Sequence, residues 1–350
     1  MDEWRGSVAL VLASSTGGIG QHVASLARGL AAAGAEFVAV EIPASPGPQD
    51  SGAIRAMRKA LSGREVDVVH AHGLRAAFVV SLARPAAPFV VTWHNAVLAR
   101  GLRGQASALV ERIVARAATL TLGASEDLVE RAVSLGARNA RLGAVAAPAL
   151  AAPKRSRAAV RAEFRLTPNI PLIVSVGRLH PQKRYDVLIE ATARWRGLTP
   201  PPMVVVAGSG PSYMQLAQRA SEVRAKLYLL GHRTDVPDLL AGADLAVITS
   251  DWEARQLFAQ EALHAGVPLV STAVGGLPGL VGDAAVLIPP GDVDALDAAV
   301  RGLLAEPARR AEYAARGPRQ AATWPTEQDT VADVIAAYAS VTTAARAGRG

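Results

Sequence analysis

The chain has 350 residues, of which half are hydrophobic and 19% are charged, and it contains no cysteine. This composition is typical of a packed globular protein of about two domains and excludes a disordered chain. The missing cysteines exclude disulfides, thiolate metal sites and a cysteine nucleophile, and they fit a cytoplasmic setting. No apolar run reaches the roughly 18 residues of a spanning helix, and the acidic N-terminus does not resemble a signal peptide.

The formal charge of +7 is concentrated in the first half of the chain. Residues 1–165 hold 20 Lys and Arg against 12 Asp and Glu, whereas residues 166–350 hold 17 against 18. The first half is therefore where we expect an anionic partner, either a membrane surface or a phosphorylated acceptor. A solvated arginine-rich surface explains the same excess. We expect no nucleic-acid partner and no cofactor.

Short apolar runs alternate with helical segments along the first part of the chain. Helices are predicted over 20–33 and 106–118. Buried strands are predicted at 7–15, 36–43, 66–72, 88–94 and 120–125.

A second series follows a Pro-, Ala- and basic-rich stretch, with the linker near residues 145–155. Its strands are predicted at 171–178, 203–210, 226–231, 244–250, 268–272 and 285–289. The fold class is therefore α/β, with two doubly wound, Rossmann-like parallel-sheet domains. Ligands of such sheets bind beyond the carboxyl ends of the strands, so the loops after the strands are the candidate sites.

The loop after the first strand is rich in glycine, with Gly17, Gly18 and Gly20. A dinucleotide-binding G-x-G-x-x-G motif is incomplete here, because Val23 occupies the third glycine position. Glu41 stands where a ribose-binding acid would, so an NAD(P)-dependent oxidoreductase remains an alternative. The glycines otherwise predict a tight turn that lets a ligand approach a helix N-terminus, or a purely structural turn.

Histidines follow two of the predicted strands. His94 could orient a hydroxyl or phosphate, and its neighbour Trp93 could shape a sugar pocket, although a structural histidine explains the same pattern. His70 and His72 have the i, i+2 spacing of a metal pair. Because no third ligand with suitable spacing accompanies them, we expect no metal site.

A basic loop after the strand at 171–178 contains Arg178, Lys183 and Arg184. Cations that converge there could hold a diphosphate leaving group without a divalent ion, and a solvated loop is the alternative. A later pair, Asp292 and Asp294, has metal-site spacing. Since it immediately precedes a predicted helix, we interpret it as a helix cap.

Glu253 and Glu261 stand eight residues apart around the start of another predicted helix. Along an ideal helix this spacing is about 12 Å, with the side chains about 80° apart around the axis. The two carboxylates are therefore unsuited to sharing one proton. They could instead hold two parts of one long ligand, with the helix N-terminus between them facing an anion.

In this order and spacing, the motifs resemble those of retaining glycosyltransferases of family 4, which have the GT-B architecture (glycosyl transferases group 1). The resemblance rests on "TGGIGQHV", "VVTWHNAV", "VSVGRLHPQK", "VVVAGSGPSYMQL", "LLGHRTDVPDLLAGADL", the paired glutamates, "GVPLVSTAVGG" and a late "TWP". It implies an N-terminal acceptor-binding domain over 1–150 and a nucleotide-sugar-binding domain over 151–322. It also implies that residues 323–350 form a helix that crosses back to the N-terminal domain, followed by a short tail.

The resemblance also implies roles for individual residues. Glu253 would contact the donor sugar, Glu261 the ribose, and the amides near Leu257 and Phe258 the diphosphate. Arg178 and Lys183 would neutralise that diphosphate. His94 would line the reaction centre, Gly18 would lie near the phosphates, and His232 would belong to the nucleobase wall.

The implied reaction is a metal-independent transfer of a hexosyl unit from a UDP- or GDP-sugar to a hydroxyl acceptor, with retention of configuration. The sequence departs from the family pattern at Arg184, Ala254 and Gly279, and "VAAP" (145–148) replaces a common Asn-Gly-Val-Asp. A non-catalytic nucleotide-sugar-binding relative is therefore a second alternative. The arginine-bearing segment 97–118 can form an amphipathic helix suited to the inner face of an anionic membrane and a lipid-linked or cell-envelope acceptor.

Overall fold

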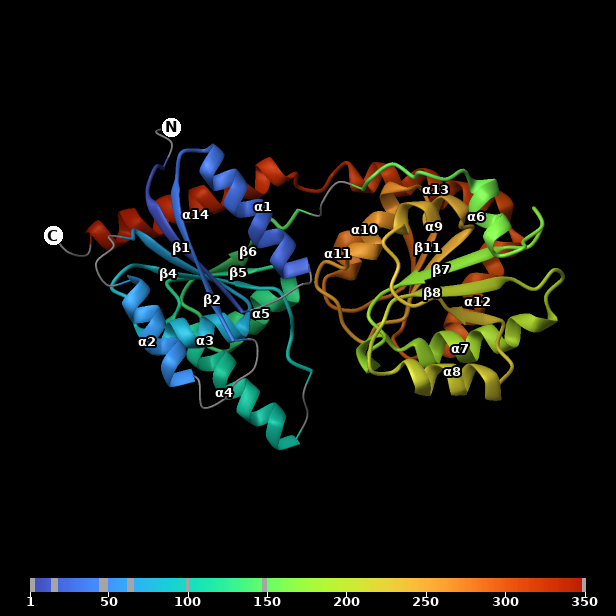
Figure 1. Ribbon diagram of the computed structural model, residues 1–350, viewed down its shortest axis with the longest axis horizontal. Coiled ribbons are helices and arrows are strands. Elements are labelled where there is room, and N and C mark those ends of the chain that lie inside the picture. Colours follow the sequence, from blue (N-terminus) through green and yellow to red (C-terminus); the bar gives the residue numbers. More distant parts are fainter. Residues whose placement is uncertain are drawn as a thin grey trace. The chain divides into compact units, whose positions relative to one another are not determined.

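The computed structural model describes residues 4–13, 18–43, 50–61, 66–98, 101–146 and 150–347. The chain divides into two compact units (Figure 1). The first unit joins Met1–Pro148 to the final segment Pro325–Gly350, and the second unit is Ala149–Trp324. Each unit is a doubly wound, Rossmann-like α/β domain, so the predicted fold class is confirmed.

The first unit contains a parallel sheet with the strand order β2-β1-β3-β4-β5-β6. Its strands are β1 (Ser7–Ala13), β2 (Glu36–Ile42), β3 (Val68–His72), β4 (Phe89–Trp93), β5 (Leu120–Gly123) and β6 (Ala140–Leu142). Every residue of β3 and β4 is buried, as expected for central strands covered on both faces. The strand order reverses between β1 and β3, and such a switch point is where doubly wound sheets bind ligands.

The helices of this unit cover both faces of its sheet (Figure 1). They are α1 (Gly18–Ala32), α2 (Asp50–Leu61), α3 (Leu74–Ala83), α4 (Gly101–Ala117), α5 (Glu126–Ser134) and α14 (Glu327–Ala347). The C-terminal helix α14 packs against α1, and its Val334, Tyr338 and Val341 are part of the same hydrophobic core as Leu10. The ion pair between Arg141 and Asp333 (2.8 Å) also fastens α14 to this unit.

The second unit has the strand order β9-β8-β7-β10-β11-β12, again all parallel. Its strands are β7 (Leu172–Val176), β8 (Met203–Ala207), β9 (Leu227–Leu229), β10 (Leu245–Ile248), β11 (Leu269–Thr272) and β12 (Ala285–Ile288). This is the dinucleotide-binding order, in which the direction of winding reverses between β7 and β10. The loops after these two strands are therefore the expected ligand site of this unit.

Two hydrophobic clusters cover the two faces of this second sheet. The helices are α6 (Arg157–Glu163), α7 (Tyr185–Arg194), α8 (Tyr213–Glu222), α9 (Val236–Gly242), α10 (Leu257–His264), α11 (Leu277–Val281), α12 (Val293–Ala305) and α13 (Pro307–Ala321), with short 3-10 turns η1 (Pro181–Lys183) and η2 (Trp195–Gly197). Asp292 caps α12, because its carboxylate accepts a hydrogen bond from the amide of Ala295 (2.8 Å). The cap interpretation of this aspartate is confirmed.

Candidate functional site

Lys183 and Glu253 meet at the switch point between β7 and β10. Lys183 is the last residue of η1, which follows β7, and Glu253 lies in the loop after β10. The Lys183 ammonium donates to a Glu253 carboxylate oxygen at 2.5 Å, and the hydroxyl of Ser250 donates to the same oxygen at 2.6 Å. Glu253 is 8% exposed, so this charged pair is largely removed from water.

The two loops that carry this pair are joined by further hydrogen bonds. The amide of Asp251 donates to the carbonyl of Gln182, and the Gln182 side chain donates back to the carbonyl of Trp252. The hydroxyl of Thr249 donates to the carbonyl of Lys183. Because backbone and side chains both contribute, the positions of Lys183 and Glu253 are set before any ligand binds.

Two glycines after β11 contact the backbone carbonyl of Glu253. Gly275 has a φ of +52°, and a Cβ at this position would lie 2.1 Å from the carbonyl oxygen of Glu253. The next residue, Gly276, donates its amide to that same oxygen at 2.9 Å. Only glycine allows this close approach, so the "GG" of "AVGG" positions the carboxylate indirectly.

Glu261 lies inside α10, four residues after its first residue. Burial raises the pKa of its carboxyl group to about 7. The helix begins at Leu257, and the Gln256 side chain caps it by accepting from the amide of Ala259 (2.8 Å). The first amides of a helix have no carbonyl partner within the helix, so those of Leu257 and Phe258 can meet an anion.

Arg255 is a residue that the sequence analysis did not select. It lies between the two glutamates, and its Nε and Nη2 atoms are buried without a hydrogen-bond partner among the described residues. Burial lowers the pKa of its guanidinium. The residue as a whole is partly exposed, but two guanidinium nitrogens held away from water without a partner are unfavourable in the isolated protein and favour an anionic ligand. The sequence does contain a signal for this residue, because an arginine stands between the two glutamates and just before the first residue of α10.

The other predicted residues of the second unit differ in exposure. Arg178 and His232 are exposed, and His232 lies in the loop between β9 and α9. The side chain of Phe258 is buried at 2% exposure, while that of Leu257 is 37% exposed. Any contribution of Phe258 to ligand binding therefore comes from its backbone amide.

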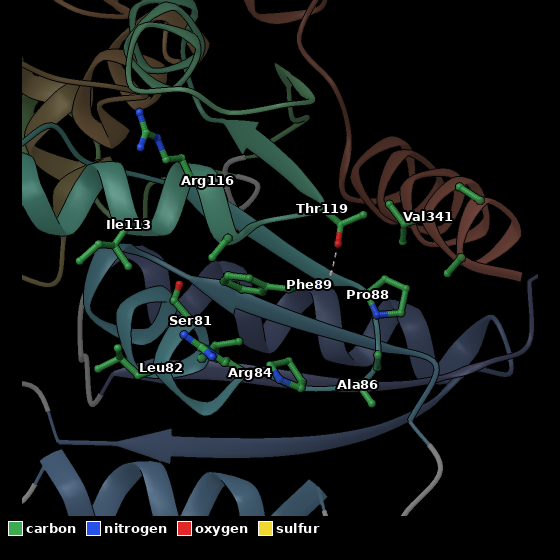
Figure 2. Close-up of a pocket in the computed structure, with 16 residues that line it drawn as sticks. Ser81, Leu82, Arg84, Ala86, Pro88, Phe89, Ile113, Arg116, Thr119 and Val341 are labelled. Atoms are coloured by element: carbon green, nitrogen blue, oxygen red, sulfur yellow. Dashed lines mark hydrogen bonds between the residues drawn. The ribbon is translucent and has the colours of Figure 1, made fainter. Parts of the chain in front are cut away.

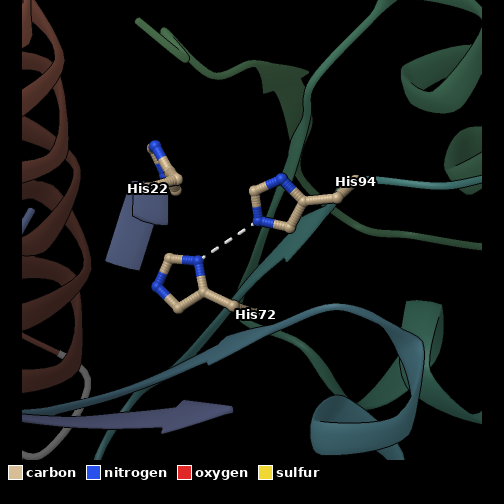
Figure 3. Close-up of side chains that lie close together, drawn as sticks. All are labelled: His22, His72 and His94. Carbon is tan, nitrogen blue, oxygen red and sulfur yellow. Dashed lines mark hydrogen bonds between the residues drawn. The ribbon is translucent and has the colours of Figure 1, made fainter. Parts of the chain in front are cut away.

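Three histidines gather at the switch point of the first unit. His22 lies in the first turns of α1, His72 ends β3, and His94 follows β4 (Figure 3). The Nδ1 atom of His72 and the Nε2 atom of His94 are 3.3 Å apart. His72 and His94 are buried, whereas His22 is partly exposed.

Spacing along the chain did not reveal a third histidine near His72. His22, which the sequence analysis did not select, brings a ring nitrogen within 4.8 Å of ring nitrogens of His72 and His94. His70 does not take part, because it bonds to Tyr338 through Nδ1 (2.7 Å) and to Thr92 through Nε2 (2.8 Å). Trp93 is likewise a core residue, 2% exposed, and not the wall of a sugar pocket.

Several other predictions concern the loops of this unit. Gly18 is the first residue of α1, while Gly17 lies outside the described residues. Glu41 is exposed near the end of β2, an edge strand. Gly18 thus belongs to the helix and not to the preceding loop, and Glu41 lies within the strand and not after it.

A cavity of about 810 Å³ in the first unit lies away from these histidines (Figure 2). Its walls include Phe89 and Thr119, where β4 and β5 begin, and Val341 of α14. It is therefore at the amino ends of the strands. Ligands of doubly wound sheets bind at the opposite edge, so this cavity is not the candidate site.

Comparison with known proteins decides the family. The model of glycosyl transferases group 1 matches residues 156–320, and that of the glycosyl transferase 4-like domain matches residues 33–148. A D-inositol 3-phosphate glycosyltransferase of Salinispora tropica is 32% identical over 340 residues, covering 85% of this chain and 68% of that protein. The chain belongs to the group 1 glycosyltransferases.

Other relatives of this glycosyltransferase match over shorter stretches or at lower identity. A glycogen synthase of Mycobacterium tuberculosis is 37% identical over 170 residues, which cover 47% of this chain and 41% of the synthase. The crystal structure of Anabaena HepE in complex with UDP and glucose superposes with a TM-score of 0.79 at 18% identity, covering 96% of this chain and 100% of HepE. The two parallel-sheet domains thus have the GT-B fold.

Proposed function

We propose that this protein transfers a hexosyl unit from a nucleoside diphosphate sugar to a hydroxyl acceptor. The observation that carries the proposal is the buried contact of Lys183 with Glu253 at the β7/β10 switch point. A carboxylate fixed beside a cation suits a ligand that joins sugar hydroxyls to a diphosphate. UDP is our first choice of nucleotide, because HepE was crystallised with UDP-glucose.

The charges of the second unit support a leaving group held without a divalent ion. Lys183 contacts Glu253, and Arg255 stands two residues after Glu253, just before the N-terminus of α10. Arg178 is an exposed third cation. Together with the amides of Leu257 and Phe258, these groups can neutralise a diphosphate as its bond to the sugar breaks. The transfer is therefore proposed to be metal-independent.

Each remaining site residue has a proposed role that follows the family resemblance. Glu253 binds hydroxyls of the transferred sugar, Glu261 binds the ribose, and His232 contributes to the nucleobase wall. His94 and Gly18 serve the reaction centre from the first unit. Retention is proposed to result from attack of the acceptor hydroxyl on the face that the diphosphate leaves, with a phosphate oxygen accepting the proton.

The test is donor binding and turnover in Glu253→Gln and Lys183→Ala, with exposed His264→Gln as the matched control. UDP-glucose binding is measured by calorimetry, and turnover as UDP release with and without acceptor extracts. We expect both site variants to lose at least about 100-fold in turnover, since Glu253→Gln removes a charged contact to the transferred sugar and Lys183→Ala removes one to the departing diphosphate. Wild-type binding without any UDP release would instead favour the non-catalytic relative.

The acceptor is proposed to be a lipid-linked or cell-envelope glycan approached from an anionic membrane surface. On α4, Leu102 (84% exposed), Leu109 (59%), Arg112 and Arg116 share an exposed stripe. Arg100 lies outside the described residues. Within the described part of the chain, no helix combines the length and apolarity needed to cross a bilayer, so contact would be peripheral.

Sedimentation with liposomes tests this contact. We expect binding to vesicles that contain anionic lipid at low salt, and weaker binding in Leu102→Glu. Equal recovery of protein with anionic and neutral vesicles would contradict the membrane proposal and leave the transfer reaction unaffected.

A further inference from the structure

His22, His72 and His94 come from three different elements and converge at the carboxyl end of the first sheet (Figure 3). One ring nitrogen from each residue can be chosen so that all three lie within 4.8 Å of one another. The ring centroids form a nearly regular triangle, with separations of 5.7 Å (His22 to His72), 5.3 Å (His22 to His94) and 5.6 Å (His72 to His94).

These dimensions agree with those of three imidazoles around one metal ion. Two nitrogens at about 2.0–2.1 Å from a tetrahedral ion are about 3.3 Å apart, and the Nδ1 of His72 lies 3.3 Å from the Nε2 of His94. With each centroid about 1.1 Å beyond its ligating nitrogen, the ring centroids in such a site are about 5.2 Å apart. The separation of His72 Nδ1 from His94 Nε2 thus has the tetrahedral value, and the nitrogens of the full set lie within 4.8 Å of one another.

The ring nitrogens of His72 are used differently. Its Nδ1 atom lies 3.3 Å from the Nε2 atom of His94, whereas its Nε2 atom points away from that contact and has no partner among the described residues. The neighbouring His70 has both ring nitrogens bonded to hydroxyl groups. His70 is thus a structural histidine with no nitrogen free for an ion.

We propose that His22, His72 and His94 form a binding site for one divalent transition-metal ion of the Zn²⁺, Co²⁺, Ni²⁺ or Cu²⁺ class. Neutral imidazole nitrogens are the preferred ligands of these ions, whereas Mg²⁺ and Ca²⁺ require oxygen ligands. Three protein ligands leave a fourth position for water or another small ligand. The proposed ligands are different residues from Lys183 and Arg255, to which the neutralisation of the diphosphate is assigned.

The surroundings of the cluster favour metal binding. Glu327 interacts electrostatically with His22 and supplies negative charge near a bound cation.

Direct metal binding tests the proposal on full-length protein without a histidine tag. Co²⁺ is titrated while its visible d–d absorption is recorded, and Zn²⁺ is measured by competition with a chromophoric chelator. We expect one ion per chain and the intense absorption of a four- or five-coordinate Co²⁺ site. His22→Ala, His72→Ala and His94→Ala should each weaken Co²⁺ binding at least about tenfold.

His232→Ala and His264→Ala, both in the second unit, are the matched controls and should bind as the wild type does. His22→Ala is the decisive variant, because this partly exposed side chain can be removed without a large cavity, and circular dichroism verifies its fold. Unchanged binding in His22→Ala, or no stoichiometric binding by the wild type, would overturn the proposal. The titration uses neither donor nor acceptor, so its outcome is independent of the transfer reaction.

Discussion

Arg255 is a residue whose burial is unfavourable for the unliganded protein. Its unpaired Nε and Nη2 atoms forgo hydrogen bonds to water, at a cost of about 1–3 kcal/mol for such a group. We expect Arg255→Met to raise the stability of the second unit by roughly 1 kcal/mol while weakening UDP binding. Thermal unfolding and calorimetric titration with UDP measure the two effects.

The exposed Arg319→Met is the control for loss of one positive charge elsewhere in the same unit. It should change neither quantity appreciably. A variant at Arg255 that lost stability and kept its affinity for UDP would show that the guanidinium has a structural role instead.

Glu261 links the candidate site to pH. Its folded-state pKa of about 7 lies above the ordinary value of 4.5, so the folded protein binds more protons than the unfolded chain between these values. The contribution to stability is fully present below pH 4.5 and is lost as pH rises through 7.

We therefore expect Glu261→Gln to gain stability relative to the wild type between pH 5 and pH 8. Allowing for partial exposure of the side chain, the gain is about 1–2 kcal/mol. Urea unfolding of both proteins at the two pH values measures it. A stability difference that is constant with pH would show that Glu261 is charged in the folded protein throughout.

At the scale of elements, the turn between η1 and α7 contains a residue in the left-handed region of backbone conformation. Arg184 adopts a φ of 49°, a conformation that favours glycine. Its side chain bonds to Asp186 and Asp251, the latter in the loop that carries Glu253. The interactions of the side chain thus offset backbone strain.

Two substitutions separate these effects. Arg184→Ala loses the ion pairs and keeps the strain, whereas Arg184→Gly loses the ion pairs and relieves it. We expect the glycine variant to be more stable than the alanine variant by about 1 kcal/mol, measured by thermal unfolding. Equal stability of the two variants would mean that the turn relaxes when the ion pairs are removed.

The sequence predicted the elements better than the contacts between them. Eleven strands were expected from apolar runs, and each is present, whereas β6 was missed because Ala140–Leu142 is a short, incompletely buried edge strand. The paired glutamates and the basic loop were found through their positions after strands. The contact of Lys183 with Glu253 depends on which strands are neighbours in the sheet. The same holds for the convergence of His22 with His72 and His94. Spacing along the chain does not reveal the order of the strands.

For the whole molecule, the two sheets differ in strand order and share the location of their candidate functional side chains, which is the switch point of the sheet. The histidines gather at the switch point of the first sheet, between β1 and β3, and Lys183 and Glu253 meet at that of the second, between β7 and β10. The second unit is formed by one continuous segment of the chain, whereas the first unit is formed by two segments.

This difference predicts unequal responses to truncation. Removing residues 325–350 takes Val334, Ala337, Tyr338 and Val341 out of the core of the first unit. We expect that unit to become sensitive to proteolysis while residues 149–324 remain resistant, because the second unit keeps all of its own core. Mass spectrometry of the digestion products identifies the surviving fragment. Equal resistance of both units would show that α14 contributes little to the first.

The position of α14 also bears on how the protein is made. Domains of a nascent chain ordinarily fold in the order in which they leave the ribosome. Here the first-synthesised sheet lacks one covering helix until the last residues of α14 emerge, by which time the whole of Ala149–Trp324 has been released. The second unit is therefore expected to fold first. Until α14 is synthesised, the N-terminal strands are expected to keep part of their apolar surface exposed to solvent. Synthesis at high levels is therefore expected to require a chaperone that protects this surface.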